Sequence, residues 1–202
     1  MHAKARFWDL WEAGFRWLFK VRPIRPGVED LFYMSKAHYI GKPFVIDGVV
    51  VKRGQPVVEL HVNNAVVARV LKKEQNILAS TVKLLQMARQ SLPALAQRMA
   101  DPEFADVQVL YGITFIHRGI ERMGFEAFPL RNRLFAPVTR WYLRQVLKAF
   151  NPEANRLLAA HPDAFVPKLV ATTKARLIAM YGYPRDPARS VKVASDDKPN
   201  RT

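Results

Sequence analysis

The chain contains no cysteine, which excludes disulfide bonds, thiolate-bound metals and a cysteine nucleophile. It also lacks the sequence signatures of phosphate-binding loops, dinucleotide-binding turns, serine-hydrolase elbows and zinc proteases. No apolar run reaches the roughly 18 residues that a membrane span needs, and the N-terminus lacks the order of basic, apolar and small residues that marks a signal peptide. We therefore expect a cytoplasmic protein, with attachment to a membrane surface as the alternative.

Histidine is scarce and scattered along the sequence. None of the histidines lies at the short spacing of a local zinc motif, although histidines far apart in sequence can still meet in a fold. The sequence therefore predicts no metal site and indicates no particular cofactor.

Apolar and aromatic residues are abundant, at 50% and 11% of 202 residues. The chain is thus long and apolar enough to build one full hydrophobic core. We expect a single globular domain over residues 1–183, followed by a polar, basic and flexible tail over residues 184–202.

Positive charge is in large excess. The formal net charge is +15, and residues 1–53 and 131–202 carry nearly all of it. Such a surface attracts anionic lipid, nucleic acid or an acidic polymer through a field that salt weakens. A soluble protein that simply has a high isoelectric point is an equally weighted alternative.

Two segments have the pattern of amphipathic helices. Residues 6–21 combine a narrow polar stripe with a wide aromatic face, which can pack on the domain or insert into a membrane interface. Packing is the stronger expectation, and Pro23 and Pro26 then end the helix. Residues 134–150 form the second, with a cationic stripe of Arg140, Arg144 and Lys148.

A run of strand-like segments follows the first helix. These segments are rich in β-branched and aromatic residues and predict an antiparallel meander over residues 31–40, 43–52 and 55–62. Asp47–Gly48, within the second segment, is a strong signal for a tight hairpin turn.

Asn63 and Asn64, which come next, allow two structures. They can form another hairpin turn, because asparagine tolerates positive φ, or Asn64 can cap a helix. Apolar residues then recur every seven positions from Leu71 to Met99 and predict one long helix with a buried face. Pro93 should kink this helix or restart it near Ser91.

The C-terminal half alternates strand and helix patterns. A strand over 106–114, a short helix over 115–123 that Gly124 stops, and a strand over 125–130 predict parallel pairing through a right-handed crossover. Residues 166–182 read as a strand, a cap at Thr172 or Thr173, and a helix stopped by Gly182. The fold class is therefore α/β (α+β), with a mixed, mostly antiparallel sheet and packed helices.

Glu59, His61 and Asn63 alternate with apolar residues and would share one face of a strand. Glu59 and His61 would lie about 7 Å apart along it. We therefore expect a neighbouring strand to supply the partner that orients His61 for proton transfer.

A second polar group lies where a strand meets a helix, the end at which parallel strands usually bind ligands. It contains Tyr111, Thr114, His117 and Arg118. We predict as catalytic residues Glu59, His61 and His117, and as substrate-binding residues Asn63, Asn64, Tyr111, Thr114 and Arg118. The alternative is that these groups serve the structure, and whether the chain is an enzyme stays open.

Several segments together resemble the YkoP-like domain family: WxxxFRWxxxVRPIRPG, ELHVNN, LYGITFIHRGxxRMGFEAFPL, TRWYLR and PKxxxxTxxxLxxxYG. Members of that family occur alone or joined to polysaccharide deacetylase domains in spore-forming Gram-positive bacteria. The resemblance implies a bacterial protein and envelope polysaccharide, or the enzymes that process it, as partners. It assigns no catalytic residues, and the metal-ligand motifs of the deacetylases are absent.

The order of elements also resembles the Gcn5-related acyltransferases, and RGIERMGFEAFPL is similar to their penultimate helix and following strand. That family holds the pyrophosphate of its acyl carrier with a glycine-containing loop, at a position that reads NNAVVARV here. Because close backbone approach to phosphate needs glycine or an equivalent nest, acyl transfer is in doubt.

Three functions therefore compete. The first is a role with envelope polysaccharide enzymes, and the second is an acyltransferase-like enzyme that uses the strand ends around His61 and His117. The third is peripheral binding of anionic lipid or nucleic acid through the basic ends of the chain.

Overall fold

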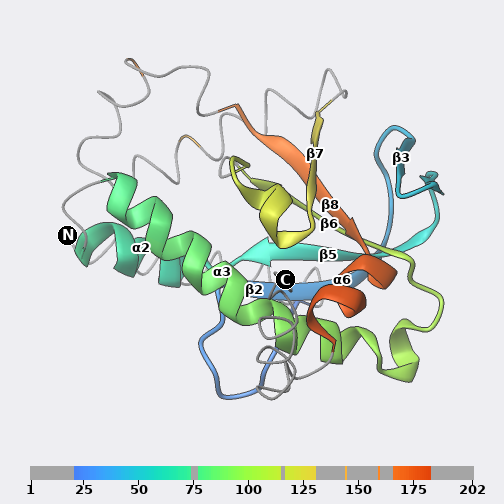
Figure 1. The fold of residues 1–202 in the computed structure, drawn as a ribbon, viewed down its shortest axis with the longest axis horizontal. Coiled ribbons are helices and arrows are strands. Elements are labelled where there is room, and N and C mark those ends of the chain that lie inside the picture. Colours follow the sequence, from blue (N-terminus) through green and yellow to red (C-terminus); the bar gives the residue numbers. More distant parts are fainter. Residues whose placement is uncertain are drawn as a thin grey trace, which may run out of the picture.

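The computed structural model describes residues 21–73, 77–114, 117–130 and 166–182, with single positions at 144 and 159. Within this part of the chain, a six-stranded sheet packs against helices, and a separate two-stranded hairpin lies beside it (Figure 1). The helices predicted over 6–21 and 134–150 lie outside the described residues except for Val21 and Arg144, and the tail over 184–202 lies outside them entirely. The limits of the domain therefore stay a prediction.

The strands of the large sheet run in the order β1-β2-β5-β6-β8-β7. In chain order they are β1 Arg22–Pro23, β2 Phe32–His38, β5 Pro56–Val62, β6 Val109–Thr114, β7 Glu126–Pro129 and β8 Lys168–Thr173. β5 and β6 pair in parallel, and the other pairs are antiparallel. The predicted mixed, mostly antiparallel sheet is confirmed.

The helices connect and cover this sheet. They are α2 Asn64–Lys73, α3 Ile77–Met99 and α6 Lys174–Tyr181, with single 3-10 turns η1 Pro102–Phe104 and η2 Ile120–Met123. α2 and α3 carry the chain from β5 to β6, because parallel neighbours need a long crossover. Among the described residues, no helix has both the length and the apolar character to cross a membrane.

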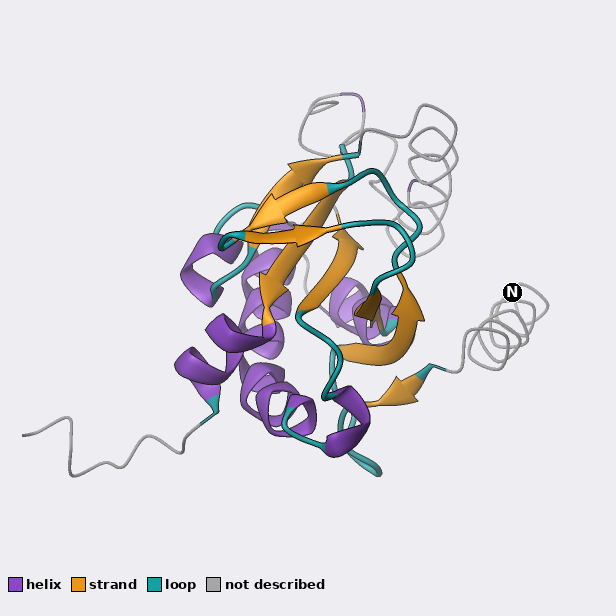
Figure 2. Ribbon diagram, turned by 90° about the vertical axis from the view of Figure 1, so that its right-hand side faces the viewer, coloured by secondary structure: helices purple, strands orange, loops and turns teal. Residues whose placement is uncertain are grey.

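The two faces of the sheet have different cores. One core joins strand residues such as Val58, Leu60 and Leu110 to helix residues such as Leu92 and Leu95 of α3. The second core lies on the other face and is closed by the hairpin of β3 Phe44–Ile46 and β4 Val49–Val51. Figure 2, turned by a quarter from Figure 1, shows the helices and strands from the side.

The predicted meander is wrong in one respect. β2 pairs directly with β5, whereas β3 and β4 pair only with each other, around the predicted turn at Asp47–Gly48. Both turn residues have positive φ, 48° and 76°, as a tight hairpin turn requires. The hairpin branches away because Tyr39 closes the β2–β5 ladder with Gln55 and Gly54.

The predicted pairing of the next two strands is also wrong. β8 lies between β6 and β7, so these two strands do not pair, and the short connection between them is a 3-10 turn. Of the two outcomes expected at Pro93, α3 shows no restart, because it continues from Ile77 to Met99, and the kink stays a prediction. Proline removes one backbone donor there, while the Ser91 hydroxyl bonds the Met87 carbonyl at 3.2 Å.

The predicted cap and stop of the last described helix are confirmed. The Thr173 hydroxyl accepts a hydrogen bond of 3.2 Å from the Arg176 backbone and caps α6. Gly182 follows the last residue of that helix. Gly124, in the left-handed conformation, ends η2 as expected.

Candidate functional site

A polar cluster lies on the sheet face opposite the helices, over the centre of β2, β5 and β6. Ser35 lies opposite Glu59 in the β2–β5 register, and Glu59 lies opposite Tyr111 in the β5–β6 register. His61, two residues after Glu59, shares the same face. We call these four residues, Ser35, Glu59, His61 and Tyr111, the face cluster.

Ser35 supplies the neighbouring-strand partner that the sequence led us to expect for His61. The hydroxyl oxygen of Ser35 lies 3.1 Å from Nε2 of His61. The nearer carboxylate oxygen of Glu59 lies 4.0 Å from the same nitrogen. In a serine–histidine–acid triad the acid would instead bond Nδ1, so this trio is not such a triad.

Burial controls the protonation of the cluster. It lowers the pKa of His61 to about 4, so the imidazole is uncharged at neutral pH. Burial also raises the pKa of Glu59, although a hydrogen bond from Tyr111 opposes this effect. The pKa of Tyr111 is raised by burial and by the nearby Glu59. The face cluster thus favours uncharged hydrogen-bonding groups.

The cluster is partly open to solvent. The side chains of His61 and Glu59 are 14% and 27% exposed, whereas Ser35 and Tyr111, on the two neighbouring strands, are buried. A ligand that reached this face would therefore meet His61 and Glu59 first. The buried pair would fix their positions.

Aromatic rings continue from the cluster toward the hairpin. Tyr111 contacts Tyr39 edge to face at 5.4 Å, and Tyr39 contacts Phe44 of β3 at 5.5 Å. Phe44 in turn contacts Phe128 of β7 at 4.8 Å. The hydroxyl of Tyr39 donates to the Lys42 carbonyl at 2.8 Å. The hairpin thus covers the end of this sheet face at Tyr39. His61 lies outside the covered part.

Asn63 and Asn64 have structural roles. α2 begins at Asn64, and the Asn63 side chain accepts from the Val66 backbone at 3.3 Å, so Asn63 is the cap. Its amide also donates to the Asp30 carbonyl at 3.3 Å. The hairpin-turn alternative is wrong, and the helix cap is correct but lies one residue earlier than expected. The buried Asn63 is therefore committed to the fold.

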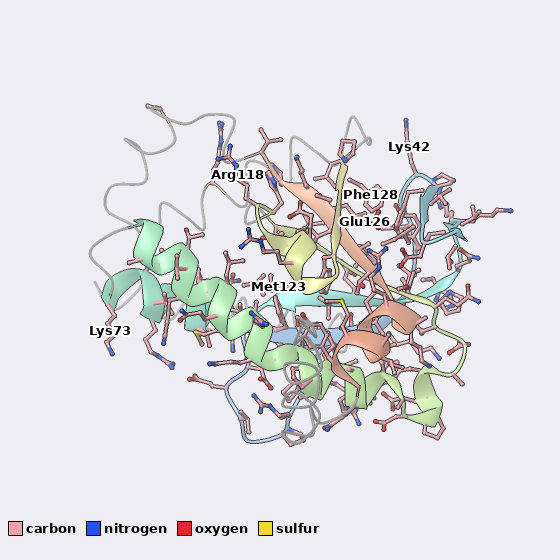
Figure 3. The ribbon with its side chains drawn as sticks, viewed as in Figure 1. Lys42, Lys73, Arg118, Met123, Glu126 and Phe128 are labelled. Atoms are coloured by element: carbon pink, nitrogen blue, oxygen red, sulfur yellow. The ribbon has the colours of Figure 1, made fainter. Side chains whose placement is uncertain are left out.

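The second predicted group lies farther along β6. Thr114 ends the strand opposite Lys168 of β8, and His117 and Arg118 follow in the loop. The pKa of His117 is lowered by burial first and then by Lys168 and Arg118. Nε2 of His117 is buried and has no hydrogen-bond partner among the described residues. Figure 3 shows Arg118 far from Lys42 of the hairpin loop.

The structure thus places Glu59, from the first predicted group, opposite Tyr111 of the second group, because β5 pairs with β6. Ser35 is the member that sequence reasoning missed. Its signal was present, because Ser35 alternates with the apolar Met34 in a predicted strand, but its neighbours depend on the register between two strands. Among the described residues, no group of three or more acidic or histidine side chains could hold a metal ion.

A mixed α+β sheet with a hydrogen-bonded polar cluster on one face describes the class of this domain. Its family follows from sequence comparison, because residues 2–181 match the YkoP domain. The chain belongs to the YkoP domain family, and the resemblance inferred from the sequence is confirmed.

One curated relative is the "Uncharacterized protein YkoP" of Bacillus subtilis (strain 168), 24% identical over 100 residues. The match covers 48% of this chain and spans about half, 55%, of that relative. No solved structure matches the chain. The likeness to the acyltransferases gains no support from these comparisons.

Proposed function

We propose that this domain binds a neutral, hydroxyl-rich glycan of the bacterial cell envelope at the face cluster. One observation carries the proposal: the 3.1 Å contact between Ser35 Oγ and His61 Nε2, on the sheet face opposite the described helices α2, α3 and α6. Membership of a family with a bacterial relative supports the setting. The chemistry of the cluster supports the ligand.

The cluster matches the hydrogen bonding of a sugar. Each sugar hydroxyl both donates and accepts, and the cluster offers a hydroxyl, an uncharged imidazole and a carboxyl group whose pKa is raised. Recognition of phosphate or sulfate would instead favour Arg or Lys, which match anionic oxygens. Neutral glycan is therefore the better fit.

Tyr33 adds an aromatic surface beside these polar groups. It lies directly opposite His61 in the β2–β5 register and is half-buried. The C–H faces of sugar rings pack well on aromatic rings, whose faces are electron-rich. A ring and a row of hydrogen-bonding groups on one sheet face can together select a pyranose.

The same geometry can support proton transfer. An uncharged His61 within hydrogen-bonding distance of a hydroxyl has the geometry of a general base, although its pKa of about 4 makes it a weak one at neutral pH. In this role His61 would accept the proton of a glycan hydroxyl, and Glu59 would stabilise the resulting imidazolium from 4.0 Å. Glycan binding must precede any proton transfer, so binding is the property to test.

The test titrates oligosaccharides of N-acetylglucosamine, which carry no charge, into the full chain and follows backbone NMR shifts. We expect the largest shifts at residues 33–35, 59–61 and 111. Ser35→Ala and His61→Gln should each weaken binding about 2- to 10-fold, the effect of one hydrogen bond. His38→Gln is the matched control, because His38 is exposed at the other end of β2.

The proposal fails if the shifts fall elsewhere on the domain or if His61→Gln binds like the parent chain. It also fails if an anionic polymer such as teichoic acid binds the cluster in preference to the neutral oligosaccharides. Either result would require a different ligand chemistry.

A further inference from the structure

The β3–β4 hairpin is apolar on both of its faces. Its inner face contributes Ile46 and Val51 to the second core. Its outer face carries Val45 and Val50, which pair directly across the two strands and are 56% and 43% exposed. Outward positions of an antiparallel hairpin are usually polar, so this exposed valine pair needs an explanation.

Three exposed cations flank the strands of this hairpin in the sequence. Lys42 lies in the loop before β3, and Lys52 and Arg53 follow β4, all of them exposed. Ile40, the most exposed large apolar side chain described at 65%, lies in the same loop as Lys42. Figure 3 shows Lys42 projecting away from the sheet. We call Ile40, Lys42, Val45, Val50, Lys52 and Arg53 the hairpin surface.

The acidic residue of the hairpin, Asp47, binds residues outside the hairpin. Asp47, at the turn, accepts a hydrogen bond from the Thr173 hydroxyl at 2.8 Å and pairs with Arg176. Arg176 also bonds Glu126 at 2.8 Å. These contacts neutralise Asp47 and fix the hairpin against α6 and β7, so the hairpin surface is positive and already ordered.

We propose that the hairpin surface binds an anionic lipid bilayer. Val45, Val50 and Ile40 enter the boundary between headgroups and acyl chains, and the three cations meet anionic headgroups. The proposal is independent of glycan binding, because it concerns residues outside the face cluster. Because Lys42, Lys52 and Arg53 belong to the basic segment 1–53, the proposal narrows membrane binding through the basic ends of the chain to one described surface.

The charge pattern favours a bilayer over other occupants. In a symmetric dimer through the valine pair, the same patch of each copy would meet, so Lys42, Lys52 and Arg53 would face their own copies and repel. A nucleic acid would use the cations but would gain little from exposed valines. An anionic bilayer uses both features at once.

Vesicle co-sedimentation of the full chain tests the proposal. We expect binding to phosphatidylcholine vesicles that contain phosphatidylglycerol, and little binding to phosphatidylcholine alone. Raising the ionic strength from about 0.1 M to about 1 M should weaken it, because the Debye length falls from about 10 Å to about 3 Å.

Variants of the hairpin surface, compared with matched variants on α2 and α3, show which residues contact the vesicles. The triple variant Lys42→Gln, Lys52→Gln, Arg53→Gln should bind these vesicles at least about tenfold more weakly. The control removes the same charge from exposed residues of α2 and α3, with Lys73→Gln, Lys83→Gln and Arg89→Gln, and should bind like the parent. Val45→Ser with Val50→Ser should also weaken binding, whereas Val82→Ser on α3 should not.

The absence of native cysteine permits a direct probe of insertion. An environment-sensitive dye on Val45→Cys should brighten and shift to the blue with anionic vesicles, while the same dye on Val82→Cys should not change. The proposal is overturned if the parent chain does not bind, if the hairpin variants bind like the parent, or if the dye at position 45 is unaffected. Dimerisation that the double valine variant abolishes, without vesicle binding, would assign the surface to a second copy.

Discussion

Asp30 and Glu59 are two shielded carboxylates of one domain, and their surroundings differ in kind. The Asp30 side chain is 1% exposed and accepts from Arg25 at 3.0 Å and from Ser91 of α3 at 3.1 Å. Glu59 meets Tyr111 and His61 and no described cation. Asp30 therefore has the partners of a group that serves the fold, whereas Glu59 has those of a group available to a ligand.

The difference separates a carboxylate that stabilises the fold, Asp30, from one that is available to a ligand, Glu59. A buried acid with an arginine and a hydroxyl is satisfied, and removing it leaves partners without an acceptor. An acid beside an uncharged histidine is held toward its protonated form by burial, at a cost to the folded state. The following variants test this contrast, beginning with the largest expected effect.

Asp30→Ala should lower the free energy of unfolding by about 2–4 kcal/mol, because it removes the acceptor for Arg25 and Ser91. Urea unfolding at neutral pH measures the loss. Glu29→Gln is the control, since the adjacent Glu29 forms an exposed pair with Arg69 and should change little. Equal losses in both variants would contradict the structural role of Asp30.

His61 should make stability depend on pH below neutrality. Its pKa is lowered to about 4 in the folded chain and is about 6.5 when unfolded. The unfolded state therefore binds the proton first, and the free energy of unfolding falls as pH drops from about 6.5 to 4, by about 1–3 kcal/mol.

His61→Gln should reduce this fall, and urea unfolding at several pH values measures it. His38→Gln provides the comparison, because His38 is exposed. If both variants keep the pH dependence of the parent, burial of His61 does not control its proton.

Glu59→Gln should increase the free energy of unfolding at neutral pH by up to about 1 kcal/mol. The raised pKa of Glu59 means that the folded state loses stability as pH rises from the unfolded pKa, about 4.3, through the higher folded one. Glutamine removes that dependence. A clear loss of stability at neutral pH would show instead that the Glu59 carboxylate is needed for folding.

Tyr111→Phe should have the smallest effect, about 1 kcal/mol or less, because it removes one hydrogen bond and keeps the ring against Tyr39. Its specific effect is on Glu59, whose pKa should rise further without the Tyr111 hydroxyl. NMR titration of the Glu59 side chain measures the change. An unchanged or lowered pKa would exclude this hydrogen bond.

Local patterns in the sequence predict part of the surroundings of Glu59 and several turns and caps. Alternation of polar and apolar residues places Glu59 and His61 on one strand face, and the Asp47–Gly48 pair specifies its own turn. These features depend on residues close together in the chain. The same holds for the caps at Thr173 and Gly124.

Features that depend on distant pairing could not be predicted in the same way. Ser35 joins His61 only because β2 pairs with β5 in one register, and Tyr111 joins Glu59 only through the β5–β6 pairing. The insertion of β8 between β6 and β7 pairs residues that are 39 to 64 positions apart in the chain, which no local propensity encodes. The Arg25–Asp30–Ser91 contact likewise requires the docking of α3.

The central claim is that His61 stays uncharged beside the Ser35 hydroxyl on the sheet face opposite the described helices. NMR titration of the His61 ring in the full chain, with His61→Gln used to assign its signal, tests it most directly. The structure predicts a pKa of about 4 that moves toward the ordinary value when Ser35→Ala opens the cluster to water. A His61 pKa at or above about 6.5 in the parent chain would contradict the account.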